Sequence, residues 1–150
     1  MTDSSNDKTL QDDLSQAPVS SDTKKENEGK ILVIEDDKFL RELLVRKLFN
    51  SGFEVESDID AAGTFKILES WMPDIILLDL ILPGEDGFSV LEKLKKDKKF
   101  ASVPVIILSN LGQQEDVDRA MALGAIDFMV KANFTLDEII EKVNKSLNLK

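Results

Sequence analysis

Short apolar runs alternate with helix-length amphipathic stretches from Lys30 onward, and this alternation is the strongest constraint on the fold. Such a pattern is typical of a parallel sheet with crossover helices. The first, third and fourth runs are apolar almost throughout, as strands covered on both faces must be. The sequence therefore predicts an α/β fold with a doubly wound, five-stranded parallel sheet and five helices. The strands are expected at residues 31–34, 53–57, 74–80, 104–108 and 126–130.

Helices are predicted between these runs, where apolar side chains recur at helical spacing and form one buried stripe per helix. The first stripe runs from Phe39 to Leu48, and Gly52 is placed to end that helix. A fourth helix is expected at about 113–123. Residues 135–138, Thr-Leu-Asp-Glu, form a capping box and predict the start of the last helix.

The composition changes at residue 30, which predicts two regions. Residues 1–29 are rich in Ser, Asp, Asn, Lys and Glu, and we expect them to be a disordered acidic and polar tail. Residues 30–150 are expected to form one domain. The chain stops three residues after Leu147, so we expect no output domain.

Cysteine and histidine are both absent, and the formal net charge is −10. These facts exclude disulfides, thiol catalysis and Ser-His-Asp triads, and they argue against the usual zinc sites. The negative charge disfavours direct binding to nucleic acid or to an anionic membrane. No apolar run has the length of a signal peptide or a membrane span, so we expect a cytoplasmic location.

Polar residues gather where the predicted strands end. Glu35 and Asp36 follow the first strand, Asp79 closes the third, Ser109 follows the fourth and Lys131 follows the fifth. Ligands bind at this edge of open parallel sheets. Carboxylate oxygens beside a hydroxyl and an amine suit a hard cation together with an anion, and Mg²⁺ fits this short ligand set better than Ca²⁺.

Each of these residues also has an ordinary structural interpretation. Asp36 or Asp37 is as well explained as a helix cap, and Ser109 as a turn residue. Lys131 alone is typical of a solvated surface amine. Asp79 differs because it lies in the apolar run Ile75 to Leu82, where an unpaired carboxylate costs several kcal/mol.

Taken together, the motifs resemble the receiver domains of two-component response regulators, over residues 30 to about 147. The segments that carry the resemblance are Ile31 to Asp37, Pro73 to Asp79, Leu82 to Gly87, Val105 to Ser109 and Leu123 to Lys131. The resemblance implies a flavodoxin-like sheet of strand order 2-1-3-4-5.

The resemblance also implies a function: the chain would accept a phosphoryl group on Asp79 in phosphorelay signal transduction. Asp36, Asp79 and the backbone carbonyl of Ile81 would ligate Mg²⁺, with Glu35 acting mainly through water. Ser109 and Lys131 would contact the phosphoryl group. Asp37 is expected to cap the following helix.

Its implied partners are a histidine kinase or histidine phosphotransfer protein and a downstream protein target. The implied partner-binding face is formed by the fourth helix, the fifth strand and the fifth helix, with Phe128 at the aromatic switch position. Such a protein is not an enzyme beyond its own phosphorylation and slow dephosphorylation.

The chain departs from the family pattern at several positions. Phe128 replaces the commoner Tyr, and Asn110 is larger than the usual residue beside the hydroxyl. Ala132 stands where the family usually has a cis-linked Pro, so either the bond before it is trans with Lys131 placed differently, or strain is stored. Ile81 and Leu111 are apolar where faster-hydrolysing relatives have polar residues, so we expect a slowly hydrolysed phosphoryl group.

Two alternatives remain open. A phosphohydrolase with an aspartate nucleophile would have a second Asp two residues after Asp79, but Ile81 occupies that position. A receiver-like interaction module that is never phosphorylated is the other alternative, and Asn110 and Ala132 are its best support.

Overall fold

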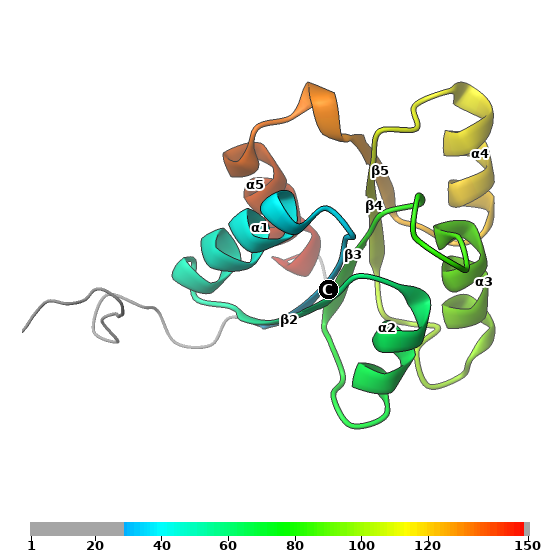
Figure 1. Cartoon of the computed structure of the whole chain (residues 1–150), viewed down its shortest axis with the longest axis horizontal. Helices are drawn as coiled ribbons and strands as arrows, with labels where there is room; N and C mark the ends of the chain where they lie inside the picture. Colours follow the sequence, from blue (N-terminus) through cyan, green and yellow to red (C-terminus); the bar gives the residue numbers. More distant parts are fainter. Residues whose placement is uncertain (1–28, 149–150) are drawn as a thin grey trace, which may run out of the picture.

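Five parallel strands form the sheet in the computed structural model of the chain, which describes residues 29–148 (Figure 1). Their order, β2-β1-β3-β4-β5, is the order expected from the sequence. The central strands β1, β3 and β4 are the three apolar runs, and β3 is buried along its whole length. The strand bounds are β1 Lys30–Ile34, β2 Glu54–Asp58, β3 Ile75–Leu78, β4 Val105–Ser109 and β5 Asp127–Val130.

Helices cover both faces of the sheet, with α1 and α5 on one face and α2, α3 and α4 on the other (Figure 1). Each face has its own apolar core, as expected for a doubly wound sheet. A single turn of 3-10 helix, η1, connects β5 to α5. The helix bounds are α1 Lys38–Asn50, α2 Ala61–Leu68, α3 Gly87–Lys96, α4 Gln114–Ala122, η1 Lys131–Asn133 and α5 Leu136–Asn148.

The third strand is shorter than predicted, although the backbone N–H groups of the residues at both of its ends still donate to β1. Before it, the Asp74 side chain accepts a hydrogen bond from the Lys30 backbone N–H at 2.8 Å. After it, the Asp79 N–H still donates to the Ile34 carbonyl at 3.0 Å, but the chain then turns toward α3. Asp79 therefore lies directly after β3 and not inside it.

Side-chain caps fix the first residue of several helices. Asp37 accepts a hydrogen bond from the Leu40 N–H, which confirms its predicted role as the cap of α1. Thr135 and Glu138 exchange side-chain to backbone hydrogen bonds at 2.8 and 3.1 Å, so the predicted capping box before α5 is confirmed.

The tail expected at residues 1–29 lies outside the described residues except for Gly29. Within residues 29–148, no helix combines the length and the apolarity that crossing a membrane requires.

Candidate functional site

A pocket of about 360 Å³ opens at the carboxyl edge of the sheet, where the loops after β1, β3, β4 and β5 meet. It contains most of the site residues that the sequence predicted. Its walls are formed by Glu35, Asp36, Asp37, Asp79, Ile81, Asn110 and Lys131.

Lys131 connects two buried carboxylates at the base of this pocket. Its Nζ lies 2.7 Å from Asp79 Oδ2 and 2.8 Å from Glu35 Oε1. Glu35 is 2% exposed and Asp79 is 3% exposed, so neither carboxylate can rely on bulk water. The Lys131 ammonium is therefore the cation that each carboxylate needs, and it comes from the residue directly after β5, 52 residues along the chain from Asp79.

The charges of this cluster shift its acid–base behaviour in two directions. Burial raises the pKa of the Glu35 carboxyl above its usual value, and hydrogen bonds from Lys131 and from the Asp37 N–H offset only part of that rise. Burial lowers the pKa of the Lys131 amine, but hydrogen bonds to Asp79 and Glu35 outweigh burial and leave it raised. Lys131 is thus held in its charged form.

Three carboxyl groups of the pocket lie close enough to share one cation. Glu35, Asp36 and Asp79 each offer an oxygen, and these oxygens lie within 4.8 Å of one another. Asp36 is exposed and the other two are buried. Because three carboxyl groups face one ammonium, the pocket carries excess negative charge, and its all-oxygen donor set fits a hard divalent cation such as Mg²⁺.

The two oxygens of Asp79 have different partners. Oδ2 accepts a hydrogen bond from Lys131 Nζ at 2.7 Å, and Oδ1 accepts one from the Ile81 N–H at 3.1 Å. The Ile81 side chain is 54% exposed at the rim of the pocket. The ligand role expected for the Ile81 carbonyl stays a prediction.

Ser109 is not among the residues that line the pocket. It is the last residue of β4, is fully buried, and its Oγ accepts a long hydrogen bond of 3.4 Å from the Leu111 N–H. In the sheet it pairs with Val130, the residue before Lys131. Asn110, not Ser109, lines the pocket, so the contact predicted between Ser109 and a phosphoryl group remains a prediction.

The bond between Lys131 and Ala132 is trans, since residues 29–148 contain no cis peptide bond. Of the two alternatives that the sequence left open, the trans bond is therefore correct. Lys131 still reaches Asp79, although η1 begins at this lysine.

Two further residues support the loops around Asp79. Arg41 was not anticipated: its guanidinium donates to the backbone carbonyls of Glu35 at 2.9 Å and Asp36 at 3.4 Å. Only its position one turn into a helix after an acidic loop could have hinted at this role. Gly87 has no room for a Cβ, which would collide with the Asp79 carbonyl oxygen.

Comparisons with known proteins agree with this geometry. Residues 31–144 match the family model described as the response regulator receiver domain. RpaA of Synechocystis sp., a DNA-binding dual master transcriptional regulator, is 34% identical over 118 residues, which cover 79% of this chain and 48% of RpaA. The chemotaxis protein CheY of Bacillus subtilis is 33% identical over 120 residues, which cover 79% of this chain and 98% of CheY. The chain thus spans about half the length of RpaA.

Solved structures give the same result. The receiver domain of the Francisella response regulator 1452 is 30% identical, with a TM-score of 0.74 over 81% of this chain and 98% of that one. The Mn²⁺-bound form of the response regulator Rcp1 is 26% identical, with a TM-score of 0.67 over 78% of this chain and 90% of that one.

Proposed function

The chain belongs to the response regulator receiver family of two-component systems, and from this premise we propose that Asp79 accepts a phosphoryl group. The observation that carries the proposal is the pairing of buried Asp79 with Lys131, next to Glu35 and Asp36. Glu35 and Asp79 are both buried, both contact Lys131 and both line the pocket. Asp79 is chosen as the acceptor because it holds the position after β3 that the family resemblance assigns to the phosphoacceptor.

The proposed reaction is an attack by a carboxylate oxygen of Asp79 on the phosphorus of a phosphohistidine. The new bond is an acyl phosphate, the bond that breaks is between phosphorus and the histidine nitrogen, and the histidine takes up a proton. An ionised carboxylate has no proton to lose, so the reaction needs no general base. Lys131 keeps its positive charge beside the incoming anion because its pKa is raised.

The carboxylates of Glu35, Asp36 and Asp79, with the backbone carbonyl of Ile81, would hold Mg²⁺. The ion would neutralise negative charge as the phosphoryl group approaches, which is the usual role of a hard cation in phosphoryl transfer. Arg41 positions the Glu35–Asp36 backbone and so keeps the two side chains at the pocket.

Phosphorylation would switch the chain through Lys131 and Ser109. Charge-assisted hydrogen bonds contribute roughly 1.5–3 kcal/mol each, and a shift from 1:99 to 99:1 takes about 5.5 kcal/mol. Two such bonds to the new phosphoryl oxygens are therefore enough. The response would reach the face formed by α4, β5 and α5, where half-buried Phe128 packs against the core on the α2–α4 side.

The proposed phosphodonor is a histidine kinase or a histidine phosphotransfer protein, because this chain has no histidine of its own. The proposed recipient of the signal is a protein partner of the switched face. The family acts as a signalling switch, and turnover of small phosphate esters is not proposed because Ile81 stands where a general acid would be needed.

The experiment is phosphorylation with acetyl phosphate and Mg²⁺, followed by intact-mass measurement. We expect the wild-type chain to gain the mass of one phosphoryl group and Asp79→Asn to gain none. Asp74→Asn is the matched control, because it removes the other aspartate that flanks β3 and should still be phosphorylated. An unmodified wild-type chain would instead support a receiver-like module that is never phosphorylated.

A further inference from the structure

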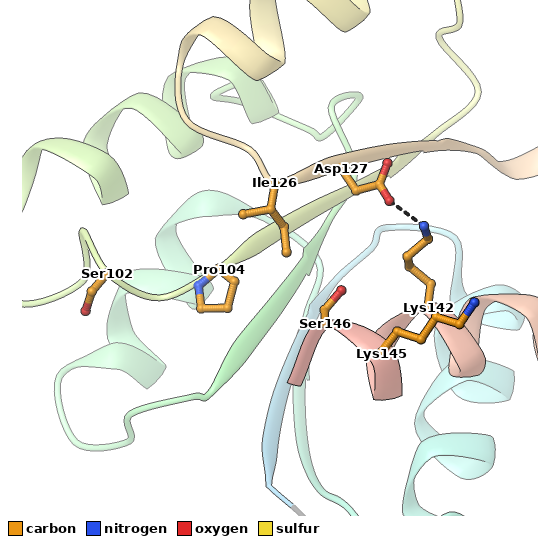
Figure 2. A pocket seen from close by; sticks show the side chains of 7 residues that line it. All are labelled: Ser102, Pro104, Ile126, Asp127, Lys142, Lys145 and Ser146. Carbon is orange, nitrogen blue, oxygen red and sulfur yellow. Dashed lines mark ion pairs between the residues drawn. The ribbon is translucent and has the colours of Figure 1, made fainter. Parts of the chain in front are cut away.

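A second pocket, of about 470 Å³, lies at the amino ends of β4 and β5, whereas Asp79 lies at the carboxyl ends of the strands (Figure 2). Its volume is in the range of ligand-binding clefts. Its walls come from the loop before β4, from the start of β5 and from the C-terminal half of α5. The residues that line it are Ser102, Pro104, Ile126, Asp127, Lys142, Lys145 and Ser146.

The chemistry of this pocket is apolar on one side and basic on the other. Ile126 is 46% exposed, and it lies with Pro104 across the hollow from α5 (Figure 2). Lys142 and Lys145 come from α5, and within residues 29–148 only Lys142 has a close ion pair, to Asp127 at 2.8 Å. Lys145 lies 3.9 Å from Glu141 in a solvent-exposed pair, which is weak.

This combination fits a peptide better than a small anion. Two lysines, one of them already paired with Asp127, provide little charge for a phosphate. Burial of the exposed Ile126 side chain against another apolar side chain would be favourable. The complementary occupant has apolar side chains with acidic residues between them. We propose that this occupant is a segment of the same chain, residues 10–19, whose sequence is Leu-Gln-Asp-Asp-Leu-Ser-Gln-Ala-Pro-Val.

The place where the N-terminal segment joins the domain supports this assignment. Gly29 lies beside the end of α5: a Cβ on it would be 3.5 Å from Leu147 Cδ1. Lys145 and Ser146, which line the pocket, immediately precede Leu147. Nine residues lie between Val19 and Gly29, so the chain takes ten residue steps from one to the other, and ten extended residues span at most about 33–36 Å. This reach allows residues 10–19 to fold back from Gly29 toward the end of α5.

Charge and connectivity add to the fit. Residues 1–28 contain seven acidic and three lysine side chains, a net charge of −4. In the proposed complex, Leu10, Leu14 or Val19 covers Ile126, and Asp12 and Asp13 face the lysines of α5. Because the segment is tethered, its effective concentration is in the millimolar range, so even a weak contact is populated.

The test uses the full-length chain with a nitroxide label at Ser15→Cys, which is unambiguous because the chain has no other cysteine. Backbone amide signals in the NMR spectrum report which residues lie near the label. We expect the largest loss of intensity at Ser102, Ile126 and Ser146. Intensity should return in about 1 M salt, where the Debye length falls to about 3 Å.

Matched variants test the charge complementarity. Lys142→Gln with Lys145→Gln should abolish the intensity loss, whereas Lys38→Gln with Lys66→Gln, on α1 and α2, should leave it unchanged. In the segment, Asp12→Asn with Asp13→Asn should abolish it, and Asp3→Asn with Asp7→Asn should not. Both pairs remove the same charge, so an equal effect of the two would contradict a specific complex.

Three results would overturn the proposal. The first is no loss of intensity at the pocket, and the second is loss that is greatest elsewhere on the domain. The third is a loss of intensity in an isotopically enriched chain without nitroxide when it is mixed with a nitroxide-labelled chain that is not enriched. The occupant would then be the segment of a second copy. None of these results bears on phosphorylation of Asp79.

Discussion

Asp74 and Asp79 flank the same strand, β3, yet their surroundings differ. Asp74 is half-buried, and its side chain accepts a hydrogen bond from the Lys30 N–H, so it fixes the start of β1 against β3. Asp79 is almost fully buried and faces the ammonium of Lys131. An aspartate beside an apolar strand is therefore not by itself a reactive site; the charged groups brought to it by other strands make the difference.

The largest expected effect concerns two lysines that pair with aspartates at opposite ends of the strands. Lys131 pairs with Asp79 at the carboxyl ends, and Lys142 pairs with Asp127 at the amino end of β5. Lys131→Met leaves Glu35 and Asp79 buried without their cation, and removal of one partner from a buried pair costs about 3–5 kcal/mol. Lys142→Met breaks the partly exposed pair with Asp127, which is worth about 1 kcal/mol or less. Urea unfolding without divalent cations measures both. Equal losses would contradict the distinction between the two ends.

The next effect is the response to Mg²⁺. A ligand that binds only the folded state at 100 times its dissociation constant stabilises it by about 2.7 kcal/mol. We expect the wild-type chain to gain stability with Mg²⁺ and to lose the gain when a chelator is added. Asp36→Asn should reduce the gain, and Asp74→Asn should retain it. If the stability gained with Mg²⁺ depended on Asp74 and not on Asp36, the ion would lie at the amino end of β3, and the proposed site would be contradicted.

Much of this contrast was predictable from the sequence. The alternating runs predict a parallel sheet with crossover helices, and the family resemblance implies its strand order. The positions of Glu35, Asp36, Asp79 and Lys131 after predicted strands place them at one edge of that sheet. The side-chain partners were not predictable, because they depend on rotamers and packing between elements. The ion pair between Glu35 and Lys131 and the support from Arg41 are examples. The contact between Asp74 and Lys30 is another, since it uses both the backbone N–H and the side chain of Asp74.

A smaller effect is expected for Asp74→Asn. The hydrogen bond from the Lys30 N–H to a carboxylate becomes one to a neutral amide oxygen. A typical net hydrogen bond contributes about 0.5–1.5 kcal/mol, so the loss should not exceed that range. Urea unfolding measures it. A loss as large as that of Lys131→Met would mean that Asp74 carries more of the domain's stability than its surroundings indicate.

The smallest effect is expected for Glu35→Gln, because burial and the hydrogen bonds to Glu35 oppose one another. The pKa of Glu35 is raised in the folded state, so its charged form is disfavoured there and stability falls as pH rises from about 4.5 through the raised pKa. Glutamine imitates the protonated form. Without divalent cations the variant should therefore be slightly more stable than wild type at pH 7, and the difference should vanish below pH 4.5. Unfolding curves at several pH values measure it, and a variant that is less stable at pH 7 would contradict the net effect of burial.

The most direct test of the central claim is to locate the acyl phosphate. Borohydride reduces an aspartyl phosphate to homoserine, so peptide mass spectrometry of the phosphorylated and reduced chain identifies the aspartate that carried it. The account predicts homoserine at position 79. Homoserine at Asp36, Asp37 or Asp74, with Asp79 unchanged, would contradict it.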